Sequence, residues 1–108
     1  MNPGDFGVVT TTVTERADAE RLTALLLTEG LAACVQILTI DSHYVWKGET
    51  NRQAELMLLI KTRAALFDGV TARLMEEHPY ETPEIVATAF AAGLPGYFDW
   101  IAENTRLA

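Results

Sequence analysis

The stretch that decides the fold is residues 32–62, AACVQILTIDSHYVWKGETNRQAELMLLIKT. Its first half, Ala32 to Trp46, carries apolar side chains at both odd and even positions, which predicts a long strand that is partly covered on both faces. Residues 47–49 supply a turn, and the apolar run within Ala54 to Thr62 is typical of a return strand that is buried on both faces. The stretch therefore predicts a long β-hairpin.

A strand and a helix are expected before this hairpin. Phe6 to Val13 is rich in Val and Thr and predicts a strand, and Thr14 is suited to cap the helix that follows. Gly30 is expected to end that helix. The residues expected on its apolar face are Leu22, Leu25 and Leu26.

A helix, a strand and a last helix are expected after the hairpin. The first of these helices covers Ala64 to Glu77, because Pro79 prevents it from continuing. Glu84 to Ala91 predicts the last main strand, and Pro95 opens a terminal helix. Residues 67, 70 and 74 (Phe67, Val70 and Leu74) are expected to face the core, and Tyr97, Trp100 and Ile101 to share one side of the terminal helix.

The order of these elements predicts an α+β fold of the ferredoxin-like βαββαβ type, with an antiparallel sheet, a long hairpin and a C-terminal helix. One domain is expected over residues 1–108. Right-handed crossovers place the first and third strands in the middle, so the second strand lies at an edge. Because a long apolar edge is an aggregation hazard unless it is paired, we expect copies of the chain to associate.

Composition limits the classes of partner. The formal net charge is -7 and the eight Lys and Arg residues are scattered, so binding to nucleic acid or to an anionic membrane surface is not expected. Cationic ligands are easier partners. Met1 to Phe6 lacks the charged and apolar regions of a signal peptide, and the longest apolar run, Leu56 to Ile60, is too short to cross a bilayer. The expected location is the cytoplasm.

A second informative stretch is the octapeptide HPYETPEI at residues 78–85. Its two prolines fix their own φ angles and keep the preceding residues out of the α region, so the segment is expected to be stiff and extended. It carries four side chains that can bind a proton, a metal or a polar ligand. These are His78, Tyr80, Glu81 and Glu84.

Five motifs in order resemble the CutA family of divalent-cation tolerance proteins, from Val8 to about Thr105. They are LAACV at 31–35, YVWKG at 44–48, LIKT at 59–62, HPY with PEI at 78–85, and YFDWI at 97–101. The order of the five makes the match specific. The resemblance implies a compact homotrimer, similar in architecture to the PII signalling proteins.

The leading functional hypothesis is therefore a CutA-like homotrimer that binds a divalent metal, with Cu(II) as the first choice. His78 offers an imidazole, and Glu77 and Glu81 offer carboxylates, which suit borderline divalent ions. Cys34 is either a further ligand or an inert core residue, and it is the only cysteine. The resemblance implies a cysteine near the end of the first strand and a second histidine before HPY, where this chain has Thr11 and Glu77.

The alternative hypothesis is a PII-like signalling module that binds a small ligand in clefts between subunits. The expected lining residues are Trp46, Lys61, Tyr80, Glu81 and Glu84. Aromatic walls with a cation and a carboxylate suit a small zwitterionic or anionic ligand. A plainer interpretation is that Trp46 and Tyr80 pack at an interface while Lys61 reaches solvent and pairs with Glu84.

Enzymatic activity is the least favoured function. The sequence has no nucleophile elbow and no Gly-rich phosphate loop. The segment Val13 to Asp18 contains Arg16 but no glycine, so it lacks the anion cradle of acylphosphatases, which share the ferredoxin-like plan. We therefore expect neither catalysis nor an organic cofactor.

Overall fold

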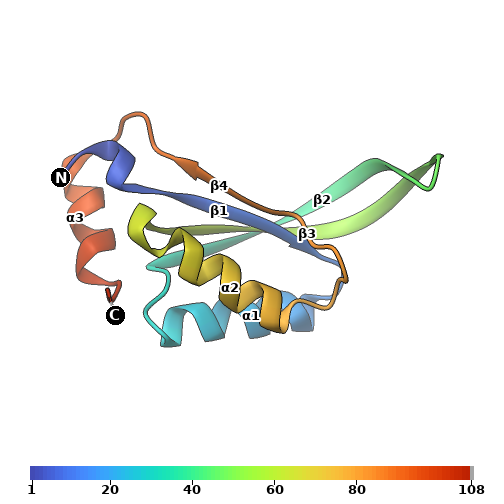
Figure 1. Ribbon diagram of the computed structural model, residues 1–108, viewed down its shortest axis with the longest axis horizontal. Coiled ribbons are helices and arrows are strands. Elements are labelled where there is room, and N and C mark those ends of the chain that lie inside the picture. Colours follow the sequence, from blue (N-terminus) through green and yellow to red (C-terminus); the bar gives the residue numbers. More distant parts are fainter. Residues whose placement is uncertain (108) are drawn as a thin grey trace.

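A computed structural model describes residues 1–107. The chain forms a four-stranded antiparallel sheet in the order β2-β3-β1-β4, with helices α1 and α2 against one face and helix α3 at one end (Figure 1). The strands are β1 (Phe6–Val13), β2 (Cys34–Trp46), β3 (Glu49–Arg63) and β4 (Ile85–Ala89). The helices are α1 (Arg16–Thr28), α2 (Phe67–Glu77) and α3 (Pro95–Glu103), with short 3-10 turns at Pro3–Asp5 and Ala64–Leu66. The predicted α+β, ferredoxin-like fold is confirmed.

The hairpin of β2 and β3 continues beyond the rest of the sheet. The last residue of β1, Val13, lies opposite Leu56, while β2 and β3 remain paired as far as Trp46 and Glu49. The part without a β1 neighbour, residues 40–55, is here called the hairpin arm (Figure 1). Its turn has positive φ angles at Lys47 and Gly48, as a two-residue hairpin loop requires.

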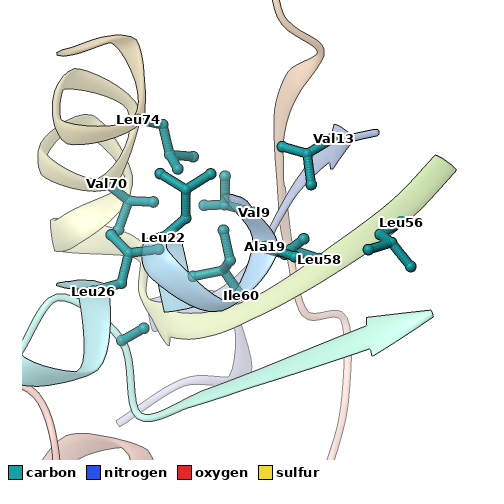
Figure 2. Packing of buried hydrophobic residues seen from close by; sticks show 11 residues of the cluster. Val9, Val13, Ala19, Leu22, Leu26, Leu56, Leu58, Ile60, Val70 and Leu74 are labelled. Atoms are coloured by element: carbon teal, nitrogen blue, oxygen red, sulfur yellow. The ribbon is translucent and has the colours of Figure 1, made fainter. Parts of the chain in front are cut away.

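The main core lies between the sheet and helices α1 and α2. Alternation along the strands sends one set of side chains toward the helices, where they interdigitate with leucines, a valine and an alanine (Figure 2). Burial of this apolar surface is the main source of stability for a domain of this size. The buried residues include Val9, Leu58 and Ile60 from the sheet and Ala19, Leu22, Leu26, Val70 and Leu74 from the helices.

The opposite face of the sheet, here called the open face, is also apolar. It carries the residues that alternate with the core set, among them Val8, Leu38, Met57, Leu59 and Val86. Leu38 is 46% exposed and Val86 is 53% exposed, whereas Val9, Leu58 and Ile60 on the core face are buried. Both long helices lie on the other side of the sheet (Figure 1). A single chain therefore leaves this apolar face uncovered by α1 and α2.

Several expected boundaries differ from the structure. The N-cap position of α1 is Glu15, whose side chain makes no capping bond, and not Thr14, whose hydroxyl bonds to Tyr80. Strand β3 begins at Glu49, five residues before the expected start at Ala54, because backbone pairing continues through polar residues. The last main strand is shorter than expected and covers only Ile85–Ala89. Leu25 is partly buried, and Leu22 and Leu26 carry the buried face of α1.

Helix α3 packs through Ile101, one of the expected trio, and through Phe98, which was not expected. Phe98 and Ile101 are buried, and Phe98 stacks on Phe6 with ring centroids 5.1 Å apart. Tyr97 and Trp100 stack on each other and remain 37% and 41% exposed. Within residues 1–107, no helix has the length and apolar character needed to span a membrane.

Candidate functional site

A cleft of about 620 Å³ lies between the hairpin arm and the segment that follows α2. The arm is a two-stranded ribbon at this point. His78 is extended, as a residue before proline should be, but residues 79–82 bend, so the segment is not extended throughout as expected. The lining side chains are Thr12, Ser42, His43, Tyr44, Trp46, Gln53, Glu55, Tyr80, Glu81, Thr82 and Glu84. Four of the five side chains expected to bind a small ligand therefore line this cleft within a single chain.

A chain of hydrogen bonds crosses the base of the cleft and ends at Glu55. The Tyr80 hydroxyl donates to Oε2 of Glu55 at 2.7 Å and lies 2.6 Å from Oγ1 of Thr14. Because Tyr80 gives its proton to the carboxylate, Thr14 donates to Tyr80. Thr14 in turn accepts from the Gln53 amide at 3.2 Å, and Gln53 accepts from the Tyr44 hydroxyl at 3.1 Å. Every donor in the chain thus points toward the carboxylate.

Burial and the neighbouring Glu55 determine the protonation of Tyr80. Desolvation is the largest cause and raises the pKa of Tyr80 to about 12, and the hydrogen bond to Glu55 acts in the same direction. The hydrogen bond with Thr14 opposes them. Tyr80 therefore remains neutral and a hydrogen-bond donor at physiological pH.

The cleft is acidic. Glu55, Glu81 and Glu84 line it, and among residues 1–107 it has no lysine or arginine in its lining. Glu55 is only 8% exposed, whereas Glu81 and Glu84 are exposed at the rim. Carboxylates with the aromatic rings of Tyr44 and Trp46 favour positive charge. This electrostatic character differs from the zwitterionic or anionic preference expected from the sequence.

His78 lies beside the cleft, between α2 and β1, with both ring nitrogens in contact. Its Nδ1 accepts the backbone N–H of Tyr80 at 3.1 Å, and its Nε2 lies 3.0 Å from Oγ1 of Thr11. Since Nδ1 is an acceptor, the proton of the neutral ring is on Nε2, which donates to Thr11. Burial lowers the pKa of His78, and a hydrogen bond to the backbone of Thr12 opposes this shift. The ring is therefore neutral at pH 7, but neither nitrogen offers a lone pair without breaking a hydrogen bond.

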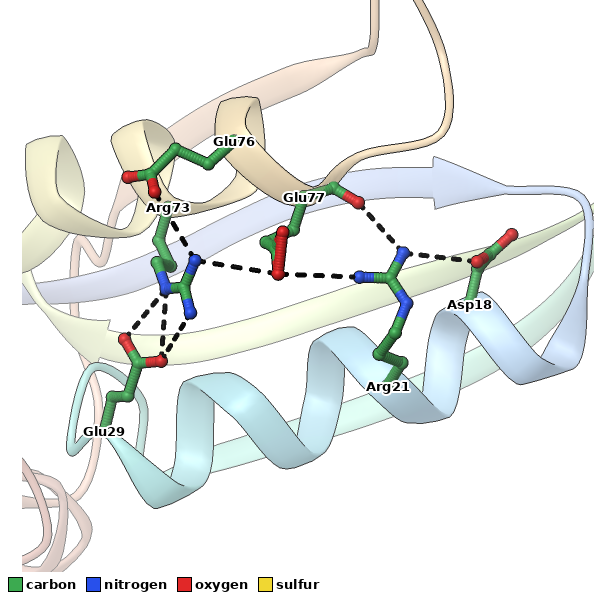
Figure 3. A network of polar contacts seen from close by, with 6 residues as sticks. All are labelled: Asp18, Arg21, Glu29, Arg73, Glu76 and Glu77. Carbon is green, nitrogen blue, oxygen red and sulfur yellow. Dashed lines mark hydrogen bonds and ion pairs between the residues drawn. The ribbon is translucent and has the colours of Figure 1, made fainter.

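Glu77 belongs to an ion-pair network between α1 and α2 (Figure 3). Its Oε1 lies 3.9 Å from Nη1 of Arg21 and 3.7 Å from Nη1 of Arg73, and its carbonyl oxygen accepts from Arg21 at 2.9 Å. Arg73 also binds Glu29 through two nitrogens, which lowers the pKa of Glu29 through that hydrogen bond. A metal at Glu77 would have to compete with two guanidinium groups.

Lys61 and Cys34 lie outside the cleft lining. They are directly opposite each other, and the nearest cleft residue on β3, Glu55, is six residues from Lys61, which is roughly 20 Å along the strand. The Lys61 ammonium donates to Oε1 of Gln36 at 2.7 Å and lies 6.0 Å from the centre of the Tyr97 ring. Among residues 1–107, Lys61 forms no ion pair with Glu84.

The three residues expected to bind metal do not converge within one chain. Cys34 is opposite Lys61, which is opposite Val8, while His78 contacts Thr11 three residues further along β1. That offset alone is roughly 10 Å, far beyond a metal–ligand bond. Among residues 1–107, no group of three or more His, Cys, Asp or Glu side chains is placed to hold a metal ion. The residues of a single chain do not fit a preformed metal centre.

Sequence reasoning missed the polar base of the cleft: Thr14, Tyr44, Gln53 and Glu55. Glu55 stands between Ala54 and the apolar run that begins at Leu56. A carboxylate beside such a run is the one signal that could have identified it, because charged residues are seldom fully buried without a partner. Its burial depends on the segment 80–84, 25 residues away, which local periodicity does not reveal.

The chain is similar in sequence and structure to a set of known proteins. The sequence model described as CutA1 divalent ion tolerance protein matches residues 7–104. A Thermus thermophilus protein named divalent-cation tolerance protein CutA is 42% identical over 99 residues, which cover 91% of this chain and 96% of that protein. The rice protein named Protein CutA 1, chloroplastic, is 38% identical, and the match covers 92% of this chain but only 56% of the rice protein.

Solved structures agree with these matches. The divalent cation tolerance protein Cut A1 from Thermus thermophilus superposes with a TM-score of 0.89 at 41% identity, covering 94% of this chain and 99% of that one. CutA1 from Ehrlichia chaffeensis superposes with a TM-score of 0.90 at 30% identity, covering 96% and 98%. These relatives are named for tolerance of divalent ions and not for an enzymatic reaction. On the match over residues 7–104, the chain belongs to the CutA1 divalent ion tolerance protein family.

Proposed function

We propose that this divalent-cation tolerance protein acts as a homotrimer and binds a small ligand in the cleft beside the hairpin arm. The observation that carries this proposal is the buried Glu55–Tyr80 pair, which forms the base of a cleft with aromatic walls. Concave sites with a few converging polar groups are the usual form of small-molecule sites. The cytoplasm remains the proposed location, although two relatives are named as chloroplastic.

The open face supports association of copies of the chain. Leu38 and Val86 are about half exposed there, and β2 is an edge strand 13 residues long. Covering such a face and edge with a second copy would bury apolar surface and satisfy backbone groups at once. Because Lys61 does not line the cleft of its own chain, it could line a cleft only in an assembly of several chains.

Binding fits the side chains of the cleft better than catalysis does. Tyr80 holds its proton up to a pH of about 12, so it is not poised as a base. His78 beside it has both nitrogens in hydrogen bonds. The cleft therefore presents donors and acceptors that can orient a ligand.

Two measurements test this proposal. Light scattering should give about three chain masses at micromolar concentration, since an obligate interface of this type persists at such dilution. A stable monomer would contradict the trimer.

A compound screen by thermal shift should find ligands that raise the melting temperature of the parent protein more than that of Trp46→Ala, because a ligand stabilises the state that binds it. Ligands that stabilise both proteins equally would place the binding site elsewhere.

Binding of a divalent cation, Cu(II) first, is the second candidate function. The observation that favours it is the lowered pKa of His78, because a neutral imidazole is the form that binds metal. Calorimetry with Cu(II) should show weaker binding to His78→Ala than to the parent. His43→Ala is the matched control, because His43 is the only other histidine and is exposed. Equal loss in both variants would indicate adventitious surface binding.

A further inference from the structure

Glu55 is a buried negative charge without a positive partner. It is 8% exposed, and no lysine, arginine or histidine among residues 1–107 forms an ion pair with it. The hydrogen bond from Tyr80 satisfies one oxygen but supplies no charge. Buried carboxylates are normally paired or bound to a cation, because an isolated buried charge is costly. The base of the cleft is therefore electrostatically incomplete.

The walls above Glu55 suit an organic cation. Tyr44 and Trp46 from β2 and Tyr80 from the opposite segment contribute three aromatic rings. Aromatic faces attract ammonium and guanidinium groups, most strongly where water is excluded. Glu81 and Glu84 add two carboxylates at the rim, which raise the local concentration of cations.

Other ligand classes fit the cleft less well. An anion would meet three carboxylates and, among the described residues, no lysine or arginine in the lining. A bare divalent ion requires several closely placed ligands, and residues 1–107 contain no such group of three. A volume of about 620 Å³ is that of a small-molecule site.

We propose that the cleft binds a small molecule through an alkylammonium group, with the cation against Glu55 and its carbon chain between the aromatic rings of Tyr44, Trp46 and Tyr80. The inference rests on the proposed function, in which this cleft is the ligand site. It adds the chemical class of the ligand and assigns Glu55 as the residue that selects its charge.

Three probes of the same shape and different charge test this selection: butylammonium, butyrate and butanol, each titrated into the purified full-length protein by calorimetry at constant salt. We expect butylammonium to bind more tightly than the other two. In Glu55→Gln its affinity should fall by about tenfold to a hundredfold, which is the usual effect of losing a hydrogen bond to a charged group. Glu49→Gln is the matched control, because it removes one charge from an exposed position on the same hairpin.

A second variant keeps the test decisive if Glu55→Gln folds poorly. Tyr44 is 40% exposed on the hairpin arm, so Tyr44→Ala should fold normally. It should weaken butylammonium binding by about threefold or more, because the butyl chain loses its contact with the ring. Tyr44→Phe, which keeps the ring, should restore part of the affinity.

Each other outcome overturns the inference in a recognisable way. Tighter binding of butyrate or butanol would refute the choice of cation but leave the cleft as a ligand site. Equal affinity of the parent and both variants for butylammonium would place the cation outside the cleft. If no probe binds and Glu55→Gln changes the mass measured by light scattering, a cationic side chain of a second copy occupies Glu55. If no probe binds and the mass is unchanged, the cleft is not a ligand site and the proposed function fails with the inference.

Discussion

Replacing Tyr80 with Phe should destabilise the fold by about 1.5–3 kcal/mol, the usual cost of losing a hydrogen bond to a charged group. The hydroxyl donates to Glu55 at 2.7 Å and links it to Thr14 at 2.6 Å, and Glu55 is only 8% exposed. Phe keeps the ring and its tilted contact with His78, whose centroid lies 4.9 Å away. The loss of stability therefore reports the missing hydrogen bond to the buried carboxylate, because Phe leaves no large cavity.

Chemical denaturation and thermal unfolding measure this loss. For a chain of 108 residues, an unfolding entropy of about 2.1 cal/mol/K per residue converts 1.5–3 kcal/mol into a fall of about 7–13 °C in melting temperature. Tyr44→Phe is the matched control, because it removes a hydroxyl bonded to the neutral side chain of Gln53 on a ring that is 40% exposed. We expect the control to change stability by no more than about 0.5 kcal/mol. Equal losses in the two variants would refute a special role for Glu55.

The pH dependence provides an independent check on the same pair. The pKa of Tyr80 is raised from 10.0 to about 12 in the folded protein, so folding favours the protonated phenol. Its contribution to stability is fully present below pH 10 and is lost as the pH rises toward 12. The stability advantage of the parent over Tyr80→Phe should therefore shrink across this window. Parallel curves for the two proteins would show that Tyr80 titrates alike in the folded and unfolded states.

Three further predictions concern other parts of the molecule. Gly7→Ala should destabilise the protein by about 1–3 kcal/mol in denaturant titrations, because a Cβ there would overlap the carbonyl oxygen of Thr88. Gly96→Ala is the control and should be tolerated, because a Cβ there meets no atom within 4 Å. Leu38→Lys on the open face should reduce the mass measured by light scattering, and an unchanged trimer would show that this face is not an interface. Cu(II) affinity that depends on His78 should fall as the pH drops through a pKa below 6.5, and a midpoint above 6.5 in calorimetry would contradict the burial of this ring.

The main elements could be predicted because hydrophobic periodicity records which faces are buried. The run at residues 56–60 predicts the central strand β3, and Val9, Leu58 and Ile60 do form the core. Periodicity fails in the hairpin arm, where residues 49–53 are polar and backbone pairing, with polar contacts such as Tyr44–Gln53 and Arg52–Asp41, holds the strands. Periodicity therefore predicts the start of β3 five residues too late.

The site was only partly predictable because it joins segments distant in the sequence. The aromatic and acidic residues of HPYETPEI attract attention by their composition, and Tyr80, Glu81 and Glu84 do line the cleft. Thr14 reads as a helix cap, since nothing local shows that its hydroxyl bonds to Tyr80, 66 residues away. The sequence groups Lys61 with these residues, although Lys61 lies six residues beyond Glu55 on β3, which is roughly 20 Å along the strand.

The open face and the cleft are both incomplete in one chain, but they lack different things. The open face lacks apolar cover, which another copy could supply by burying side chains such as Leu38 and Val86, each a stabilisation of about 1 kcal/mol or more. The cleft lacks positive charge at Glu55, and added apolar surface would make that deficit more costly because it would remove water from the carboxylate. If association of copies also covered the cleft, it would increase the need for a cation at Glu55. Association and ligand binding should then reinforce each other, with the cation as the component that makes burial of the carboxylate favourable.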